Sequence, residues 1–432
     1  MSVHFINHAV AVCAPLEAAG QLDSQFGRDG KAWLEFANSL WSMANDVAVD
    51  RQGRLLVAAK VAGERGCQFG LMRLHQDGST DLSFGTHGQV VGQFENGRES
   101  TAGKIHLLPD GRILLCGLMY EDPQHTLPAL ALFDQQGRLD PAFGTAGVQV
   151  VRLPGNLSQG ARDPWLPPGV PGAEACDVQV QADGRILLLA NHQYQFSDHV
   201  GIVICLTATG ELDNAFNGRG FAMVRHLLLN TWLSSLLIQK DGAIVVAGAI
   251  DFPQEGLLAR FDKDGQLDAS FAEHGFLSFR VDGRSAHVSR VIEQTNGQLL
   301  CVGSSRDPMH SLTFSVRSDG RPDHRCNAGH PLLTNIGQSP SQWTAACGCS
   351  DGSVWTVGAT IGGIDADFIV ARHLPDGRPD QAFADGNGWV RTRLGRSLDT
   401  ATAVVLQDDQ RVVVAGYSLD GHYRAVLVRY LT

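Results

Sequence analysis

Short apolar segments alternate along most of this chain with polar turns that contain glycine. The stretch 109–153 holds one unit of the pattern. An Asp-Gly turn leads into the apolar segment 112–117, and a variable loop leads into 129–133. A second glycine turn then leads through the motif Leu-Asp-x-x-Phe-Gly (139–144) to a last apolar segment, 148–153. Because Val, Ile, Leu and Ala dominate with little polar alternation, the segments predict strands that are covered on both faces.

Two markers of this unit recur with the same period. The Asp of Asp-x-x-Phe and the Gly of the first turn both return at intervals of 55 to 59 residues, with one interval of 73. The markers are Asp23, Asp81, Asp140, Asp213, Asp268, Asp323 and Asp380, and Gly53, Gly111, Gly184, Gly242, Gly297 and Gly352, with Gln410 in the equivalent place. Asp-Gly and Asn-Gly favour hairpins because glycine accepts a positive φ. Several short strands in a unit of this length indicate a propeller or a solenoid.

The first full unit gives the four candidate strands, named a, b, c and d: 46–50, 55–59, 70–75 and 89–94. The pattern DGRILLCG, ALALFD, GRLDPAFG resembles the bacterial delta-60 repeat family from about Gly20 to Thr432. That resemblance implies a β-propeller and says little about function. Single turns depart from the family pattern at Cys326 in place of Phe, at Pro322 and Pro379 in place of Leu, and at Gln410 in place of Gly.

The order of strands predicts an all-β fold, a seven-bladed β-propeller of four-stranded antiparallel blades. A d strand at 31–36 precedes six complete units, and the chain ends with strands a, b and c alone. The N-terminal outer strand is therefore expected to join the C-terminal strands, which closes the ring and removes an exposed sheet edge. We interpret 1–432 as a single β-propeller domain with blade repeats at about 37–94, 95–153, 154–226, 227–281, 282–336, 337–394 and 395–432, the last closed by about 20–36.

Two segments fall outside this scheme. A further c-like strand at 8–15 has no vacant place in the ring. The segment 154–175 is rich in Pro and Gly and accounts for the long interval. It is expected to be a loop that joins a d strand to the next a strand.

Composition narrows the partners and the compartment. The net charge of −11 argues against a nucleic-acid partner, which requires a basic surface. Nine cysteines show no disulfide framework, no Lys or Arg precedes the first apolar run, and no apolar stretch approaches the length of a membrane span. We expect a cytoplasmic protein without a membrane span. The family resemblance implies a secreted or surface-associated protein as the alternative.

Because antiparallel strands alternate in direction, the a–b and c–d turns share one face of the disc, and the b–c and d–a loops share the other. We call these the turn face and the variable face. The turns are nearly identical in every unit, whereas the loops differ in length and sequence. Function tends to lie in loops that differ, so the variable face near the channel mouth is the expected place for any site.

Two sets of residues are candidates for ligand binding on that face. Four tryptophans lie in or near d–a connections: Trp41, Trp165, Trp232 and Trp343. Tryptophan is common at binding surfaces, although each of these also fits as a wedge between blades. Four charged residues share one position just before strand a: Asp46, Lys104, Asp177 and Arg290. They ring the channel mouth as ligand contacts, or they are solvated or paired with one another.

Other polar patterns favour structural roles. Arg recurs near the end of strand c, at Arg73, Arg260, Arg317, Arg372 and Arg429, where pairing with the Asp of the following turn is expected. The run Asp262-x-Asp264-Gly265-x-x-Asp268 lacks EF-hand spacing and favours a turn over a calcium loop. Cys347-x-Cys349 has no second pair nearby to suggest zinc. No metal and no cofactor are predicted, and no catalytic motif is present.

Three hypotheses for function follow. The first is a non-catalytic binding scaffold that engages a protein or a carbohydrate ligand through the variable face. The second is an enzyme, a hydrolase or lyase acting on a carbohydrate or small ester, with its site at the channel mouth. The third is a structural propeller whose role lies in its partner. Without a catalytic motif, we expect the scaffold rather than the enzyme.

Overall fold

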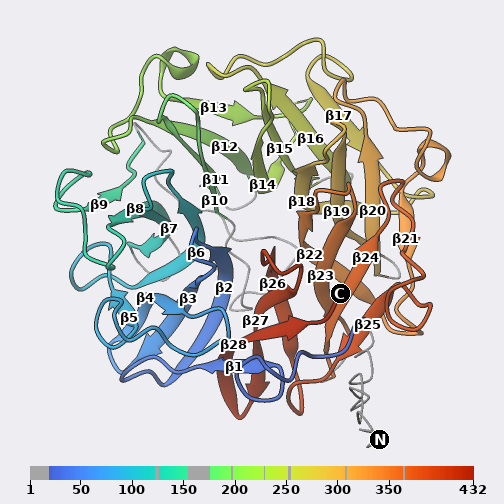
Figure 1. Cartoon of the computed structure of the whole chain (residues 1–432). Helices are drawn as coiled ribbons and strands as arrows, with labels where there is room; N and C mark the ends of the chain where they lie inside the picture. Colours follow the sequence, from blue (N-terminus) through green and yellow to red (C-terminus); the bar gives the residue numbers. More distant parts are fainter. Residues whose placement is uncertain are drawn as a thin grey trace, which may run out of the picture.

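The computed structural model describes residues 19–121, 126–153, 176–195, 198–227, 229–251, 254–306, 309–362 and 365–432. In these residues, seven four-stranded antiparallel sheets stand side by side in a ring around a central channel (Figure 1). The predicted fold class, a seven-bladed β-propeller, is confirmed. We number the blades 1 to 7 from β2 onward.

The strands of blades 1 to 4 are β2 (Trp41–Val49), β3 (Leu55–Gly63), β4 (Gly66–Leu74) and β5 (Gln89–Gly92); β6 (Ser100–Leu107), β7 (Ile113–Tyr120), β8 (Thr126–Phe133) and β9 (Val148–Val150); β10 (Asp177–Val180), β11 (Ile186–Gln195), β12 (Asp198–Leu206) and β13 (Phe221–Val224); and β14 (Thr231–Ile238), β15 (Ile244–Ile250), β16 (Glu255–Phe261) and β17 (Phe276–Phe279). Those of blades 5 to 7 are β18 (Ala286–Glu293), β19 (Leu299–Ser305), β20 (His310–Val316) and β21 (Leu332–Thr334); β22 (Ser341–Gly348), β23 (Val354–Thr360), β24 (Phe368–His373) and β25 (Trp389–Thr392); and β26 (Asp399–Leu406), β27 (Val412–Asp420), β28 (His422–Tyr430) and β1 (Lys31–Leu34). Two short 3₁₀ turns, Phe216–Gly218 and Asn327–Gly329, lie before β13 and β21.

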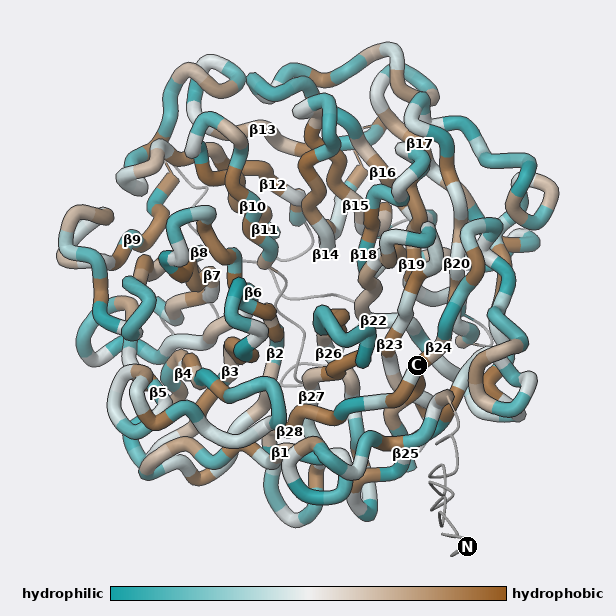
Figure 2. The backbone as a smooth tube through the Cα atoms, in the orientation of Figure 1, coloured by the Kyte–Doolittle hydropathy of each residue, from teal (hydrophilic) through white to brown (hydrophobic). Residues whose placement is uncertain are grey.

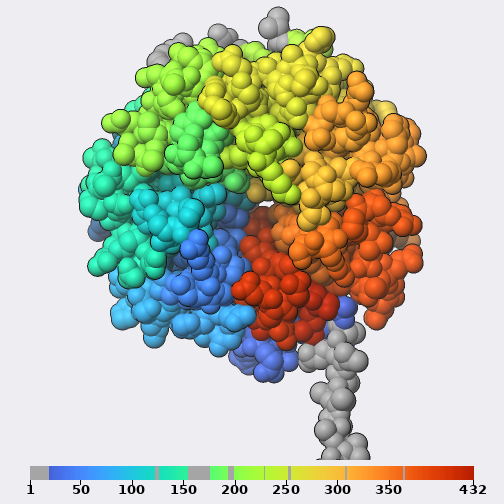
Figure 3. All heavy atoms as spheres, turned by 45° about the horizontal axis from the view of Figure 1, so that its top comes forward, coloured from blue at the N-terminus to red at the C-terminus, as the bar shows by residue number. Residues whose placement is uncertain are grey.

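The ring closes in blade 7, where β1 is the outer strand beside β28. Lys31 pairs with Val428 and Leu34 with Ala425 in antiparallel register. Just before β1, the Gly20 N–H donates to the Leu431 carbonyl at 2.9 Å. The first and last described segments therefore lie against each other at the rim (Figure 3). The predicted closure is confirmed, whereas the strand expected at 8–15 and the insertion 154–175 lie outside the described residues.

The core lies between the blades. Every side chain of β15 and β19 is buried, and apolar colour follows the strands while the connections are polar (Figure 2). One cluster joins Leu114 and Leu130 of blade 2 to Leu188 and Val200 of blade 3. Each such side chain contributes about 1.5–3 kcal/mol on burial. Because a blade covers its faces only with its two neighbours, the ring must be complete for the core to be complete.

On the turn face, the repeated Phe of six blades, and Cys326 in blade 5, inserts against the c–d turn of the next blade. Phe84 is fully buried, and a Cβ added to Gly137 of blade 2 would lie 2.9 Å from its ring. The next residue, Gly85, donates its N–H to the Gln136 carbonyl of blade 2 at 2.8 Å. The same contact of a repeated residue with a glycine of the next blade involves Phe26 and Gly78, Phe143 and Gly210, Phe216 and Gly265, Phe271 and Gly320, Cys326 and Gly377, and Phe383 and Gly20.

The arginines at the end of strand c bind the repeated Asp, as predicted, in four of five cases. The ion pairs are Arg73–Asp81 (2.7 Å), Arg260–Asp268 (2.5 Å), Arg372–Asp380 (3.1 Å) and Arg429–Asp23 (2.8 Å). The prediction is wrong for Arg317, which pairs with Asp319 at 2.7 Å. Arg317 follows β20, two residues beyond the equivalent position, which Ser315 occupies eight residues before its Asp.

Arg73 also reaches the next blade. Its guanidinium donates to the Gln135 carbonyl of blade 2 and lies over the Phe84 ring, 4.6 Å from the centroid. Arg260 and Arg429 make the same contacts in blades 4 and 7. The Arg therefore joins the Asp, the Phe and the neighbouring blade in one cluster.

Phe84→Ala is expected to destabilise the protein by about 3–5 kcal/mol, since it removes a fully buried ring between two blades. Cys326→Ala, at the equivalent position of blade 5, removes far less apolar surface and is expected to cost about 1 kcal/mol. Urea unfolding followed by circular dichroism measures both. Equal costs would contradict the role of the ring as the inter-blade contact.

Asp81→Asn tests the ion-pair cluster through pH. Burial by itself raises the pKa of Asp81, but hydrogen bonds from Ser83 and Arg73 outweigh it and lower the pKa to about 2. Because the folded-state pKa lies below the unfolded one, the carboxylate stabilises the fold above about pH 4 and loses this effect as the pH falls through about 2. The variant is expected to be less stable than wild type by about 2 kcal/mol at pH 7, with a difference that vanishes in acid. Asp319→Asn, at a more exposed turn carboxylate, serves as the control in urea titrations across this pH range.

Candidate functional site

The inner strands line the channel and break regular pairing at the same place. In six blades one residue of strand a bulges out of its pairing with strand b. In blade 3, strand β10 begins at Asp177, directly after the position where the other blades have the bulged residue. In five blades the b-strand residue beside the bulge is glycine, and a Cβ on Gly117 would overlap the Thr101 carbonyl of the inner strand. The five are Gly117, Gly248, Gly303, Gly358 and Gly416. These glycines leave the space that the bulged inner strand occupies.

In blades 1, 6 and 7 the side chain of the bulged residue connects its blade to the next. Asn45 donates from Nδ2 to the Ala102 carbonyl at 2.6 Å. Thr344 donates from Oγ1 to the Ala401 carbonyl at 2.7 Å. Thr402 donates in the same way to the Ala44 carbonyl at 2.8 Å, which carries the connection across the ring closure. Side chains at the bulge are thus used to hold adjacent inner strands together.

The four predicted charged residues all lie directly after the bulge or its equivalent. Asp46, Lys104 and Arg290 lie inside their a strands, and Asp177 is the first residue of β10. The expectation that all four precede strand a is therefore wrong. The cause is the bulge, which lengthens the strand toward the variable face. The carboxylates also accept backbone bonds from the next blade: Asp46 from Ile105 N–H and Asp177 from Leu236 N–H, both at 2.9 Å.

These charges are brought together as two ion pairs. Lys104 lies 3.6 Å from Asp46 in the adjacent blade. Arg290 of blade 5 extends past blade 4 to place its guanidinium 2.6 Å from Asp177 of blade 3. Asp177 is only 2 % exposed, so its charge depends on this partner. The four residues were expected either to contact a ligand or to be solvated or paired. The structure contains the pairs, and ligand contact by the same residues stays a prediction.

A histidine stands close to this network. His106 follows Ile105 in β6, and burial lowers its pKa while the nearby Asp177 carboxylate opposes the shift. The imidazole is therefore neutral near pH 7. Sequence reasoning missed it because a lone histidine in a strand has no motif around it.

The predicted tryptophans separate into two kinds. Trp232 and Trp343 are buried between blades, with 1 % and 0 % of their surface exposed. Trp41 is half-buried at the variable-face end of β2, beside Leu40, which is 59 % exposed. Trp165 lies outside the described residues. Ligand binding by the four stays a prediction, but among the described ones only Trp41 presents surface.

Trp41 belongs to an aromatic cluster formed by blades 1 and 7. Its ring meets the edge of Tyr423 at a centroid distance of 5.8 Å, and Tyr423 meets Tyr417 at 5.7 Å. Arg424 lies over the Trp33 ring at 4.4 Å. We call Leu40, Trp41, Tyr417 and Tyr423 the aromatic patch. Sequence reasoning identified Trp41 alone, because the tyrosines come from the other end of the chain.

A second polar pair lies at the variable face between blades 3 and 4. His199 Nε2, in β12, is 3.7 Å from Asp251 Oδ2, which follows β15. The His199 ring also meets Trp232 edge-on at 6.4 Å. The pair has the composition of a general-base dyad, although neither residue belongs to a sequence motif.

The weaker metal candidates form turns. Asp262 Oδ1 accepts the N–H groups of Asp264 and Gln266, each at 2.9 Å, and Asp264 pairs with Lys263. No group of three or more His, Cys, Asp or Glu side chains suited to a metal occurs in the described residues. The eight cysteines of the described ranges, Cys347 and Cys349 included, form no disulfide bonds. No helix in the described ranges is long and apolar enough to cross a membrane.

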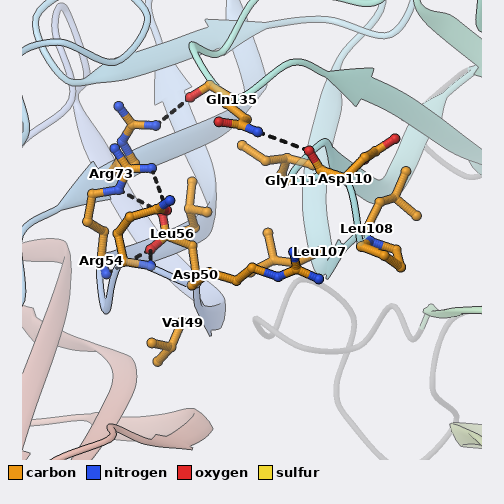
Figure 4. Close-up of a pocket in the computed structure, with 14 residues that line it drawn as sticks. Val49, Asp50, Arg54, Leu56, Arg73, Leu107, Leu108, Asp110, Gly111 and Gln135 are labelled. Atoms are coloured by element: carbon orange, nitrogen blue, oxygen red, sulfur yellow. Dashed lines mark hydrogen bonds and ion pairs between the residues drawn. The ribbon is translucent and has the colours of Figure 1, made fainter.

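A pocket of about 410 Å³ opens on the turn face between blades 1 and 2 (Figure 4). It is lined by the a–b turns of both blades, together with Arg73 and Gln135. The sequence predicted a site on the variable face, and this pocket lies on the opposite one. Its signal in the sequence is Asp50, which occupies a position that is glutamine in four other blades.

Arg290→Met is expected to cost about 3–5 kcal/mol of stability, because it leaves the buried Asp177 carboxylate without its counter-charge. Lys104→Met is the matched change at the longer Lys104–Asp46 pair of 3.6 Å, and it is expected to cost less than about 1 kcal/mol of stability. Urea unfolding at pH 7 compares the two. A small and equal loss for both variants would show that Asp177 does not depend on Arg290.

A short part of the chain matches a known protein family. Residues 239–271 match a family described as a domain of unknown function (DUF5122) beta-propeller, which covers the a–b turn of blade 4 through Phe271. No curated protein matches the sequence. Among solved structures, the chain is similar to polysaccharide lyase Uly1, with 11 % identity, 97 % of this chain and 94 % of that chain covered and a TM-score of 0.47. It is also similar to a glucose dehydrogenase, with 11 % identity, coverage of 93 % and 99 % and a TM-score of 0.41.

Proposed function

We propose that this protein is a non-catalytic binding scaffold that engages a protein or a glycan through its variable face. The observation that carries the proposal is the aromatic patch, where Trp41 and Tyr423 meet at 5.8 Å beside the 59 % exposed Leu40. Apolar and aromatic surface of this kind on a soluble protein marks an interaction site.

The framework also holds the patch rigidly. Trp41 begins β2, Tyr423 lies in β28, and the two strands belong to blades joined by the Thr402–Ala44 hydrogen bond of 2.8 Å. Binding groups carried on strands lose little conformational entropy when a ligand binds. The patch is therefore organised before the ligand arrives.

Catalysis, as a hydrolase or lyase, is the second candidate, and the His199–Asp251 pair at 3.7 Å favours it. A carboxylate beside an imidazole is the arrangement of a general base. The carboxylates of the channel do not add to this, since Asp46 and Asp177 are engaged by Lys104, Arg290 and backbone N–H groups. Turnover of polysaccharides or p-nitrophenyl esters that disappears in His199→Ala would support an enzyme over a scaffold.

Trp41→Ala is expected to weaken ligand binding at least about tenfold, because it removes the largest ring of the patch. The full chain would be applied to a glycan array and, separately, used as bait for proteins, and the affinity of each identified ligand would then be measured for wild type and variant. Leu227→Ala is the control, since Leu227 is 77 % exposed at another junction of the ring. A ligand that binds Trp41→Ala and Tyr423→Ala as tightly as wild type would exclude the patch as its site.

A further inference from the structure

The turn-face pocket lies beside blade 1, which lacks a side chain that three other blades extend across the junction to the next blade. This side chain belongs to the first residue of each a–b turn. The backbone N–H of that residue donates to the carbonyl of the residue four positions later. In chain order it is Asp50, Leu108, Gln181, Gln239, Gln294, Cys349 and Gln407. Glutamine thus occupies this position in four blades.

Three of these glutamines reach the c–d turn of the next blade. Gln181 donates from Nε2 to the Lys263 carbonyl at 3.1 Å, Gln294 to the Pro375 carbonyl at 3.5 Å, and Gln407 to the Gln76 carbonyl at 3.4 Å. The side chain crosses the junction between two blades on the turn face. It therefore occupies space that would otherwise be open.

Blade 1 has Asp50 at this position, and its shorter side chain turns back to its own blade. Oδ1 accepts the N–H groups of Gln52 and Arg54 at 2.9 Å, and Oδ2 lies 2.7 Å from Arg54 Nε. The carbonyl that a glutamine would reach, that of Gln135, accepts from the Arg73 guanidinium, whereas the equivalent Gln76 carbonyl accepts from both Arg429 and Gln407. The junction between blades 1 and 2 is left with the pocket of about 410 Å³. Pockets of about 300–1,000 Å³ are typical of small-molecule sites.

The pocket has an apolar floor and a charged rim. Strand ends and turn residues from both blades form the apolar part, namely Val49, Leu56, Leu107, Leu108, Pro109 and Ile113. Arg54 and Arg73 stand together on one wall, and Asp110 and Gln135 on the other (Figure 4). A ligand with an apolar body and a polar end matches this lining.

Among the residues that the structure describes, the charged residues on the rim of the pocket form ion pairs, except for one arginine. Arg73 is committed to Asp81, and Arg54 to Asp50 and Asp81. Asp110 is occupied by Arg112 at 2.8 Å. Arg51, exposed at the tip of the turn, forms no ion pair with any residue in the described part of the chain. The uncommitted charge at the pocket is therefore a guanidinium, which binds carboxylate, phosphate or sulfonate groups well.

We propose that this pocket binds a small amphipathic anion, with its apolar body on the floor between blades 1 and 2 and its acidic group at Arg51. The site is independent of the aromatic patch, which lies on the opposite face.

The fluorescent dye 1-anilinonaphthalene-8-sulfonate is a suitable probe, and N-phenyl-1-naphthylamine is its counterpart without the sulfonate. Arg51→Glu reverses the rim charge and is expected to weaken the sulfonate dye roughly three- to tenfold while leaving the neutral dye nearly unchanged. Asp50→Gln restores the bridging residue and is expected to weaken both dyes at least about tenfold by filling the pocket. Arg138→Glu is the control, since Arg138 is a 75 % exposed side chain in a turn of blade 2 that does not line the pocket.

Circular dichroism and thermal melting would establish that each variant is folded before titration. If Asp50→Gln does not fold, Arg51→Glu with both dyes decides the question. Equal affinity of the sulfonate dye for wild type and Arg51→Glu would overturn the proposal, as would an equal loss in Arg138→Glu. Displacement of the dye by inorganic phosphate alone at the same concentration would overturn the requirement for an apolar body.

Discussion

The fold depends on one contact between neighbouring blades on the turn face. The repeated Phe of one blade packs on a glycine of the next, as Phe84 does on Gly137, and the following N–H donates across the junction. A blade by itself exposes both faces of its buried strands, so the stability of each sheet comes from its neighbours. Repeating the contact seven times around a closed ring leaves no terminal blade with an uncovered face.

The sequence predicts this framework well because the framework is repeated. Glycine and aspartate markers with a constant period give the number of blades, and the strand count gives the closure by β1. The arginine–aspartate pairs follow too, except for Arg317, whose place two residues beyond the equivalent position changes its partner. Arg317 lies beyond the end of β20, in the c–d turn itself, so its guanidinium meets the turn carboxylate of Asp319 and not the repeated Asp323.

The candidate site is harder to predict, because it depends on where each inner strand bulges. Trp343 directly precedes the bulged residue, Trp232 precedes it by two and Trp41 by four. The first two are buried between blades, and the third reaches the end of the strand and the surface. Similarly, the ion pair between Arg290 and Asp177 links residues 113 apart, which no local pattern connects. The pocket, by contrast, has a signal in the sequence. Asp50 stands where four other blades have glutamine, and this difference is recognised only when the repeats are aligned with one another.

The closure by β1 has a consequence for biosynthesis. The four residues of β1 leave the ribosome early, but their strand partner, β28, is made about 390 residues later. Until then the nascent blades have an uncovered face at each end of the growing array, and β1 is an unpaired edge. A chaperone that shields this edge during translation would therefore act on a segment that the finished protein hides.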